Sequence, residues 1–126
     1  MRQSNPDGQH ARKSLLIVTP VYDDWESFGH LLRDIEAALP AAHYDVEIIA
    51  VDDCSNASPA VPVLAGSIAS VTVLRLTMNV GHQRAIAVGL VHADSELNAE
   101  SVAIMDSDGE DVPARLERRI VTATAK

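Results

Sequence analysis

Four short apolar segments, each running into a polar cluster, limit the folds open to this chain more than any other feature. They are Leu15–Val18, Val46–Val51, Val71–Leu76 and Ser101–Met105. The first has no polar alternation, which is typical of a strand covered on both faces of a parallel sheet. The third alternates apolar and polar residues, which predicts a less covered strand, at an edge of the sheet.

Helical patterns separate these strands. The first is an amphipathic stripe with Asp23 and Asp24 at its start, where N-cap and first-turn carboxylates belong, and Pro40 at its end. Pro20 is expected to end the first strand, and Pro113 to open the last helix. The predicted helices are 25–39, 61–68, 83–93 and 114–123.

Strands that alternate with helices predict an α/β fold: a Rossmann-like, mostly parallel four-stranded sheet flanked by helices. We expect a flexible polar arm over residues 1–13, without the apolar stretch of a signal peptide, and one domain over 14–126. The formal charge of −8 argues against nucleic acid as a partner. No apolar run reaches the roughly 18 residues of a membrane span, so a soluble chain is expected.

The last apolar segment leads into Asp106-Ser107-Asp108, where four carboxylates fall within six residues. Such a density of charge repels itself unless a cation or a helix N-terminus offsets it. Two carboxylates just after a buried strand can hold a hard divalent cation against a phosphate. The alternative is a solvated turn that caps the next helix.

The other strand ends carry further polar groups at the edge where parallel sheets bind ligands. Of Asp52 and Asp53, one is expected to cap the following turn and the other to accept hydrogen bonds from a base or a ribose. Asn79-Val80-Gly81 predicts a turn with Gly81 at positive φ, before a helix N-terminus that attracts a phosphate or a carboxylate. Arg84 is interpreted either as the one cation beside this pocket or as a surface arginine.

Four stretches in order, 17–22, 51–55, 79–90 and 105–113, together resemble the family 2 glycosyltransferases with the GT-A fold. Within that family the similarity is greatest to the polyprenyl-phosphate transferases, which use dolichol phosphate for mannose and bactoprenol for glucose. The resemblance implies the N-terminal, donor-binding half of such an enzyme, with strand order 3-2-1-4. It also implies an inverting transfer of a sugar from a UDP- or GDP-sugar to an acceptor, polyprenyl phosphate at a membrane being one expectation.

Site roles follow from the resemblance. Asp53 would hydrogen-bond the base, Asp106 and Asp108 would be catalytic, and Mg²⁺ or Mn²⁺ would lie on Asp106, Asp108 and Glu110 as a Lewis acid. Glu110 stands where the polyprenyl branch commonly has a glutamine. The implied nucleotide-sugar-binding residues are Pro20, Val21, Tyr22, Asp24, Asp53, Arg84, Asp106 and Ser107, the first three as the wall of the base pocket.

The chain departs from the family in two respects. Cys54 stands where the family usually has glycine, which is tolerable if its φ is negative. Domains of the family also run well beyond this length, so the isolated chain is expected to bind its donor but turn over little.

Two alternatives remain: a phospho-receiver-like regulatory module, and a degenerate domain kept for interactions. A homo-oligomer through the exposed sheet edge is a further expectation. The expected location is cytoplasmic, at the membrane face if a longer chain carries an anchor.

Overall fold

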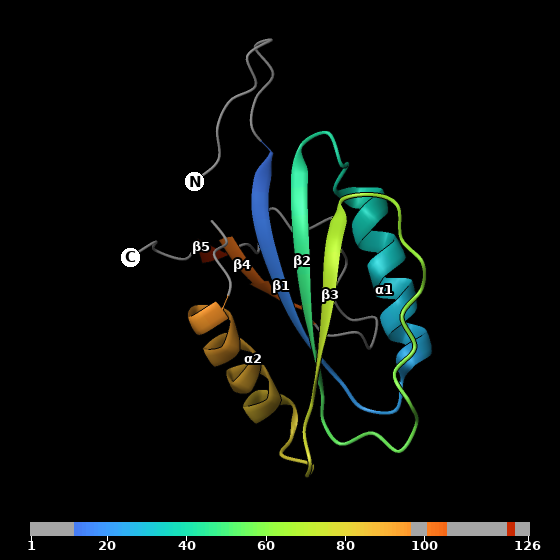
Figure 1. The fold of residues 1–126 in the computed structure, drawn as a ribbon, viewed down its shortest axis with the longest axis vertical. Helices are drawn as coiled ribbons and strands as arrows, with labels where there is room; N and C mark the ends of the chain where they lie inside the picture. The colour runs from blue at the N-terminus through green and yellow to red at the C-terminus, as the bar shows by residue number, and fades with distance from the viewer. Residues whose placement is uncertain (1–11, 97–100, 106–120, 123–126) are drawn as a thin grey trace.

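The computed structural model describes residues 12–96, 101–105 and 121–122, which contain one five-stranded sheet (Figure 1). Its strands are β1 (Lys13–Val21), β2 (Tyr44–Asp52), β3 (Ile68–Arg75), β4 (Ser101–Ile104) and β5 (Val121–Thr122). They lie in the order β3-β2-β1-β4-β5. The first four are parallel, which confirms the predicted order 3-2-1-4 and the edge position of the third strand.

The two helices within the described residues, α1 (Trp25–Ala38) and α2 (His82–Glu96), pack on opposite faces of the sheet. The alternation of side chains along β1 decides which face each residue serves. Leu15 and Ile17 belong to the cluster with α1, whereas Leu16 and Val18 belong to the cluster with α2. Both sets are buried, which explains why this strand shows an unbroken apolar run.

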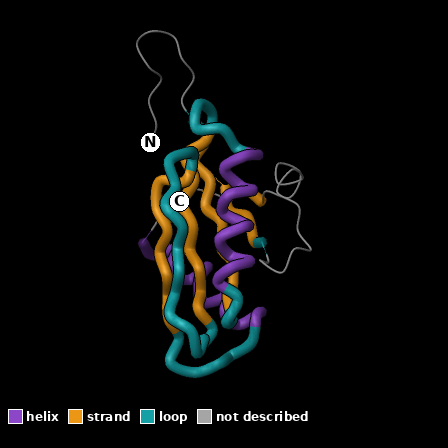
Figure 2. Tube along the Cα trace, turned by 90° about the vertical axis from the view of Figure 1, so that its right-hand side faces the viewer, coloured by secondary structure: helices purple, strands orange, loops and turns teal. Residues whose placement is uncertain are grey.

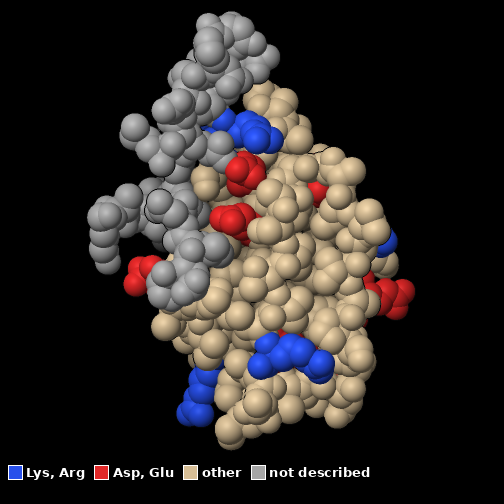
Figure 3. Space-filling view, viewed as in Figure 1, with Lys and Arg blue, Asp and Glu red and all other residues tan. Residues whose placement is uncertain are grey.

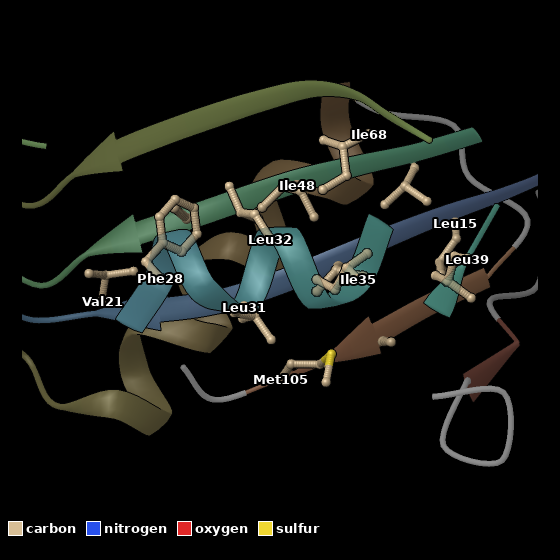
Figure 4. Packing of buried hydrophobic residues seen from close by; sticks show 14 of the residues in the cluster. Leu15, Val21, Phe28, Leu31, Leu32, Ile35, Leu39, Ile48, Ile68 and Met105 are labelled. Atoms are coloured by element: carbon tan, nitrogen blue, oxygen red, sulfur yellow. The ribbon is translucent and has the colours of Figure 1, made fainter. Parts of the chain in front are cut away.

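The larger apolar cluster lies between α1 and the sheet (Figure 4). The apolar stripe of α1 is buried there against aliphatic side chains of β1 and β2, as its helical spacing predicts. On the other face α2 lies very close to the strands. A Cβ added at Gly89 would come within 2.6 Å of Val18 Cγ1 and 2.9 Å of Val51 Cγ2, so this helix position requires glycine.

The helix predicted over 61–68 is wrong. Residues 61–65 have no regular structure, and Ile68 already opens β3. The connection between β2 and β3 runs alongside α1 for most of its course (Figure 2). Gly66 N and Ile68 N donate to Glu36 Oε2 at 2.9 and 3.1 Å, so a side chain of α1 satisfies main-chain groups that a helix would have paired internally. Pro62 and Gly66 both disfavour a helix.

Two further predictions need correction. Pro20 does not end β1, which continues to Val21. Val18 O accepts from Met105 N, so even-numbered residues of β1 direct their main-chain groups toward β4. Because β4 ends opposite Val18, Pro20 lies past the end of this ladder, where the missing N–H of proline is tolerated.

The helix predicted over 114–123 is wrong at its end, because residues 121–122 form β5, antiparallel to β4. Their β-branched side chains favour a strand. The rest of that prediction lies outside the described residues, as do residues 1–11 of the predicted arm. Lys13, the last residue of that arm, is the first residue of β1. No helix among the described residues is long and apolar enough to cross a bilayer.

Candidate functional site

The loops that follow β1, β2 and β3 all lie at one end of the sheet, the lower end in Figure 1. Asp53 N donates to Val21 O over 2.9 Å, which joins the ends of the first two strands. β4 ends beside β1, and Met105 N bonds to Val18 O at 3.1 Å, so the chain leaves the sheet at this same edge. The predicted convergence of strand ends is therefore present for the described residues.

Asp53 fastens the turn before α2 to the end of β2. Its side-chain oxygens accept from Val80 N at 2.7 Å and from Gly81 N at 2.9 Å, and its carbonyl accepts from Asn79 Nδ2 at 3.1 Å. Gly81 has φ +89°, as predicted. Asp53 is only 1% exposed, so its side chain is a buried hydrogen-bond acceptor beside the N-terminus of α2.

Asp52 is the member of the pair that caps the following turn. Its Oδ1 accepts from Ser55 N at 2.9 Å, and its Oδ2 accepts from Arg75 Nε at 2.8 Å. The residue is fully buried, whereas the Arg75 side chain is 51% exposed. Arg75 also reaches Ser55 O through Nη2 at 3.5 Å. The ion pair thus holds the end of edge strand β3 against the loop after β2.

Arg75 is a basic residue at this edge that the sequence did not predict, in addition to Arg84. Both lie at the carboxyl-end edge, Arg75 at the end of β3 and Arg84 in the first turn of α2. Basic groups are visible at the lower end of the molecule in Figure 3. Arg84 is exposed, whereas Arg75 carries a buried partner. A basic residue closing a strand otherwise made of small and apolar residues was the available signal.

Asp23 joins the loop after β1 to the loop after β2. Its Oδ1 accepts from Asn56 N at 2.7 Å and Ala57 N at 3.0 Å, its Oδ2 accepts from Asn56 Nδ2 at 3.3 Å, and its own N donates to Ser55 Oγ at 2.8 Å. Asp23 was expected only as a helix-start carboxylate, and nothing in the sequence pointed to this link.

Asp24 is the N-cap of α1, as expected, and its Oδ1 accepts from Ser27 N at 3.1 Å. Hydrogen bonds from Ser27, through its side chain first and its backbone N–H second, lower the pKa of the Asp24 carboxyl. Its exposed carboxylate is therefore held as an anion at the positive end of the helix.

The three residues of the predicted pocket wall differ in their exposure to solvent. Pro20 and Val21 are buried in the end of β1, whereas the Tyr22 side chain is 46% exposed. Of the three, Tyr22 alone offers a large side-chain surface to a ligand. An exposed ring just after a strand end is suited to stacking on a planar group.

Cys54 has φ +64°, in the left-handed region, so the condition of a negative φ does not hold. The turn keeps the backbone that glycine would take, and the cysteine side chain is strained in it. Cys54 N donates to Asp52 O at 2.8 Å, and Ser55 N donates to Asp52 Oδ1, so bonds to Asp52 hold the chain on either side of this conformation.

The residues expected at the metal, Asp106, Asp108 and Glu110, lie outside the described residues, as does Ser107. Among the residues that are described, no group of three or more His, Cys, Asp or Glu side chains could hold a metal ion. The structure nevertheless delivers the chain at Met105 to the carboxyl-end edge, next to β1.

An open groove of about 380 Å³ lies between the first turns of α1 and the loop after β2. It is lined by Trp25, Glu26, Gly29, His30, Arg33, Ala60, Val61 and Pro62. Apart from the start of α1 it shares no residue with the site described above.

Comparison with known proteins identifies the class. Residues 16–124 match the family model "Glycosyl transferase family 2", so the chain belongs to this family of transferases. The receiver-like alternative is set aside by this match.

Two relatives show which glycosyltransferases the chain is similar to. The chain is 31% identical over 114 residues to an undecaprenyl-phosphate 4-deoxy-4-formamido-L-arabinose transferase of Erwinia tasmaniensis, covering 88% of this chain and 34% of that protein. It is 39% identical over 105 residues to a Mycobacterium tuberculosis protein whose name places it among the glycosyltransferases, covering 82% of this chain and 30% of that protein. The chain thus spans about a third of the length of these relatives.

Solved structures with a similar fold include S. aureus TarS 1–349, at 20% identity, with a TM-score of 0.54. The match covers 75% of this chain and 27% of that one. The same protein in complex with UDP-GlcNAc gives a TM-score of 0.55, again at 20% identity, over 75% of this chain and 26% of the other. This likeness supports the Rossmann-like α/β fold.

Proposed function

We propose that this chain is the donor-binding half of a glycosyltransferase that takes a sugar from a nucleotide-diphosphate donor, UDP- or GDP-linked. The observation that carries the proposal is the carboxyl-end edge, where Asp53 binds the ends of β1 and β2 to the turn before α2. Membership of glycosyltransferase family 2 supplies the reaction class. Open α/β sheets bind their ligands where the strand order reverses, which in this sheet lies between β1 and β4.

The nucleotide would lie across the loops after β1 and β2. Tyr22 would stack on the base, over a floor formed by Pro20 and Val21, which are fixed in β1. Asp24 and Arg84, both exposed at this edge, would contact the polar parts of the donor. For Asp53 we propose a role through the turn it holds, because both of its oxygens already accept main-chain N–H groups.

The metal proposal rests on Asp106, Asp108 and Glu110. Asp106 would also lie near the ribose, and Ser107 would contact the nucleotide sugar. Their oxygen donors are the kind that Mg²⁺ and Mn²⁺ prefer, and they follow the strand whose end reaches the site. When bound, such a cation stabilises the leaving nucleotide diphosphate as a Lewis acid. In this scheme Asp106 and Asp108 are the catalytic residues, and the transfer inverts the configuration at the anomeric carbon of the sugar.

Polyprenyl phosphate is the acceptor we propose, because the Erwinia relative is named as an undecaprenyl-phosphate transferase. The transfer would then take place at the cytoplasmic face of a membrane. The chain by itself should bind the donor but transfer the sugar poorly, because it spans only about a third of the length of such relatives.

Isothermal titration of the chain with UDP and with GDP, each with and without Mn²⁺, tests the proposal. We expect binding that requires the cation. The matched variant Asp108→Asn should bind nucleotide equally with and without Mn²⁺. Binding by the unmodified chain that ignores the cation would overturn the metal proposal, and no binding at millimolar nucleotide would overturn the donor-binding function.

A further inference from the structure

The loops after β1 and β2 are locked together through one residue that the proposed site does not use. Asp23 receives three hydrogen bonds from Asn56 and Ala57 and donates one to Ser55, so every polar group of its side chain and its N–H faces the second loop. We call this set of four bonds the Asp23 clamp.

The two loops that the clamp joins each contain a strained backbone position. Asp23 has φ +57° and Cys54 has φ +64°, and both are residues other than glycine in the left-handed region. Such strain persists only where surrounding contacts over-determine it. Here the clamp supplies those contacts for Asp23, and the turn closed by Asp52 supplies them for Cys54.

The clamp is also badly placed to serve stability. Three of its four bonds join exposed residues, Asp23 with Asn56 and Ala57, and hydrogen bonds between exposed groups exchange readily with water; only Ser55 is buried. The buried cluster under α1, by contrast, does not depend on it. What the clamp does fix is the position of Tyr22, the exposed ring directly before it, relative to the loop that begins at Asp53.

From this geometry we propose that Asp23 is a positioning residue for the donor nucleotide: it holds the Tyr22 ring and the 53–57 loop at the spacing a base requires. The inference rests on the proposed function. Loss of this positioning should lower the affinity for the ligand much more than the stability of the fold, because a preformed site avoids the cost of ordering its loops on binding.

The test uses Asp23→Gly, Asp23→Asn and Asn56→Ala, each titrated with UDP and Mn²⁺ and each melted thermally. Glycine accepts a φ of +57° without strain, so Asp23→Gly removes the three side-chain bonds of the clamp, keeps the main-chain bond to Ser55 Oγ and leaves the backbone free to fold. Asparagine tolerates the same φ and keeps one acceptor oxygen for the two main-chain N–H groups. Asn56→Ala, the matched control, removes only the 3.3 Å side-chain bond and keeps both main-chain bonds.

We expect Asp23→Gly to weaken UDP binding about tenfold, and Asp23→Asn and Asn56→Ala to stay within about threefold of the unmodified chain. All melting temperatures should agree within a few degrees. Equal UDP affinity in Asp23→Gly and the unmodified chain would overturn the inference, as would a loss in Asp23→Gly that Asp23→Asn fails to restore. An unmodified chain that binds no nucleotide would overturn the proposed function itself, before any variant is compared.

Discussion

Arg75 Nε donates to Asp52 Oδ2 over 2.8 Å, so the last residue of edge strand β3 is ion-paired to the fully buried last residue of β2. The Asp52 carboxylate holds Ser55 N with its other oxygen. One buried charge therefore organises both the sheet edge and the turn that carries Cys54.

Replacing Arg75 by glutamine should lower the free energy of unfolding by about 1–3 kcal/mol, because it leaves a buried carboxylate without its counter-charge. The half-exposed guanidinium keeps the loss below that of a fully buried pair. Urea unfolding measures it, with Arg84→Gln as the exposed arginine control, expected within about 0.5 kcal/mol of the unmodified chain. In a chain that already carries Asp52→Asn, Arg75→Gln should lower the free energy of unfolding by less than it does in the unmodified chain. If the losses of the two single variants simply add, the two residues are not coupled.

Substitution of Asp53 by asparagine should weaken the binding of UDP and GDP by the same factor, about tenfold. Asparagine offers one acceptor oxygen and turns an NH₂ group toward the second main-chain donor, so the turn before α2 loses a contact whichever base is bound. Titration calorimetry with both nucleotides gives the two factors. A variant that loses only the preference between bases would instead show that Asp53 contacts the base directly.

Changing Cys54 to glycine should stabilise the chain by about 0.5–1 kcal/mol. The left-handed φ costs a residue with a Cβ about 1–2 kcal/mol, and the greater freedom of glycine in the unfolded chain offsets part of that gain. Cys54→Ala is the control, because it removes the thiol but keeps the Cβ. Chemical denaturation that ranks the alanine variant as stable as the glycine variant would contradict this account of the strain.

Removal of the Asp24 carboxylate, the N-cap of α1, should make the stability of the chain depend less on pH in the acid range. The pKa of Asp24 is lowered below its usual 3.8, so its contribution is present above that value and is lost as the pH falls through the lower, folded-state pKa. Asp24→Ala should therefore reduce the melting temperature by roughly 4 °C at pH 7, with the difference shrinking toward pH 3. Melting curves across this range check it, and a difference that is constant with pH would point to a cause other than the charge.

Local patterns were sufficient for much of the fold. The stripe of α1, its Asp24 cap and the positive φ of Gly81 each depend on residues within one or two turns of chain, which is the range over which propensity acts. The helix expected over 61–68 failed because Glu36, some 30 residues earlier in the sequence, binds the N–H groups of Gly66 and Ile68.

By itself the sequence determined the α/β class and the carboxyl-end edge on which Asp53 lies, because these follow from short-range periodicity and the geometry of parallel sheets. The strand order was implied only by the family resemblance. Only the tertiary structure decided that Asp52 serves Arg75, that Asp53 serves Val80 and Gly81, and that Asp23 serves Asn56. These partners are separated by 23 to 33 residues. The physical reason is that a carboxylate can satisfy any N–H within reach, and which one is within reach depends on how the strands are placed side by side.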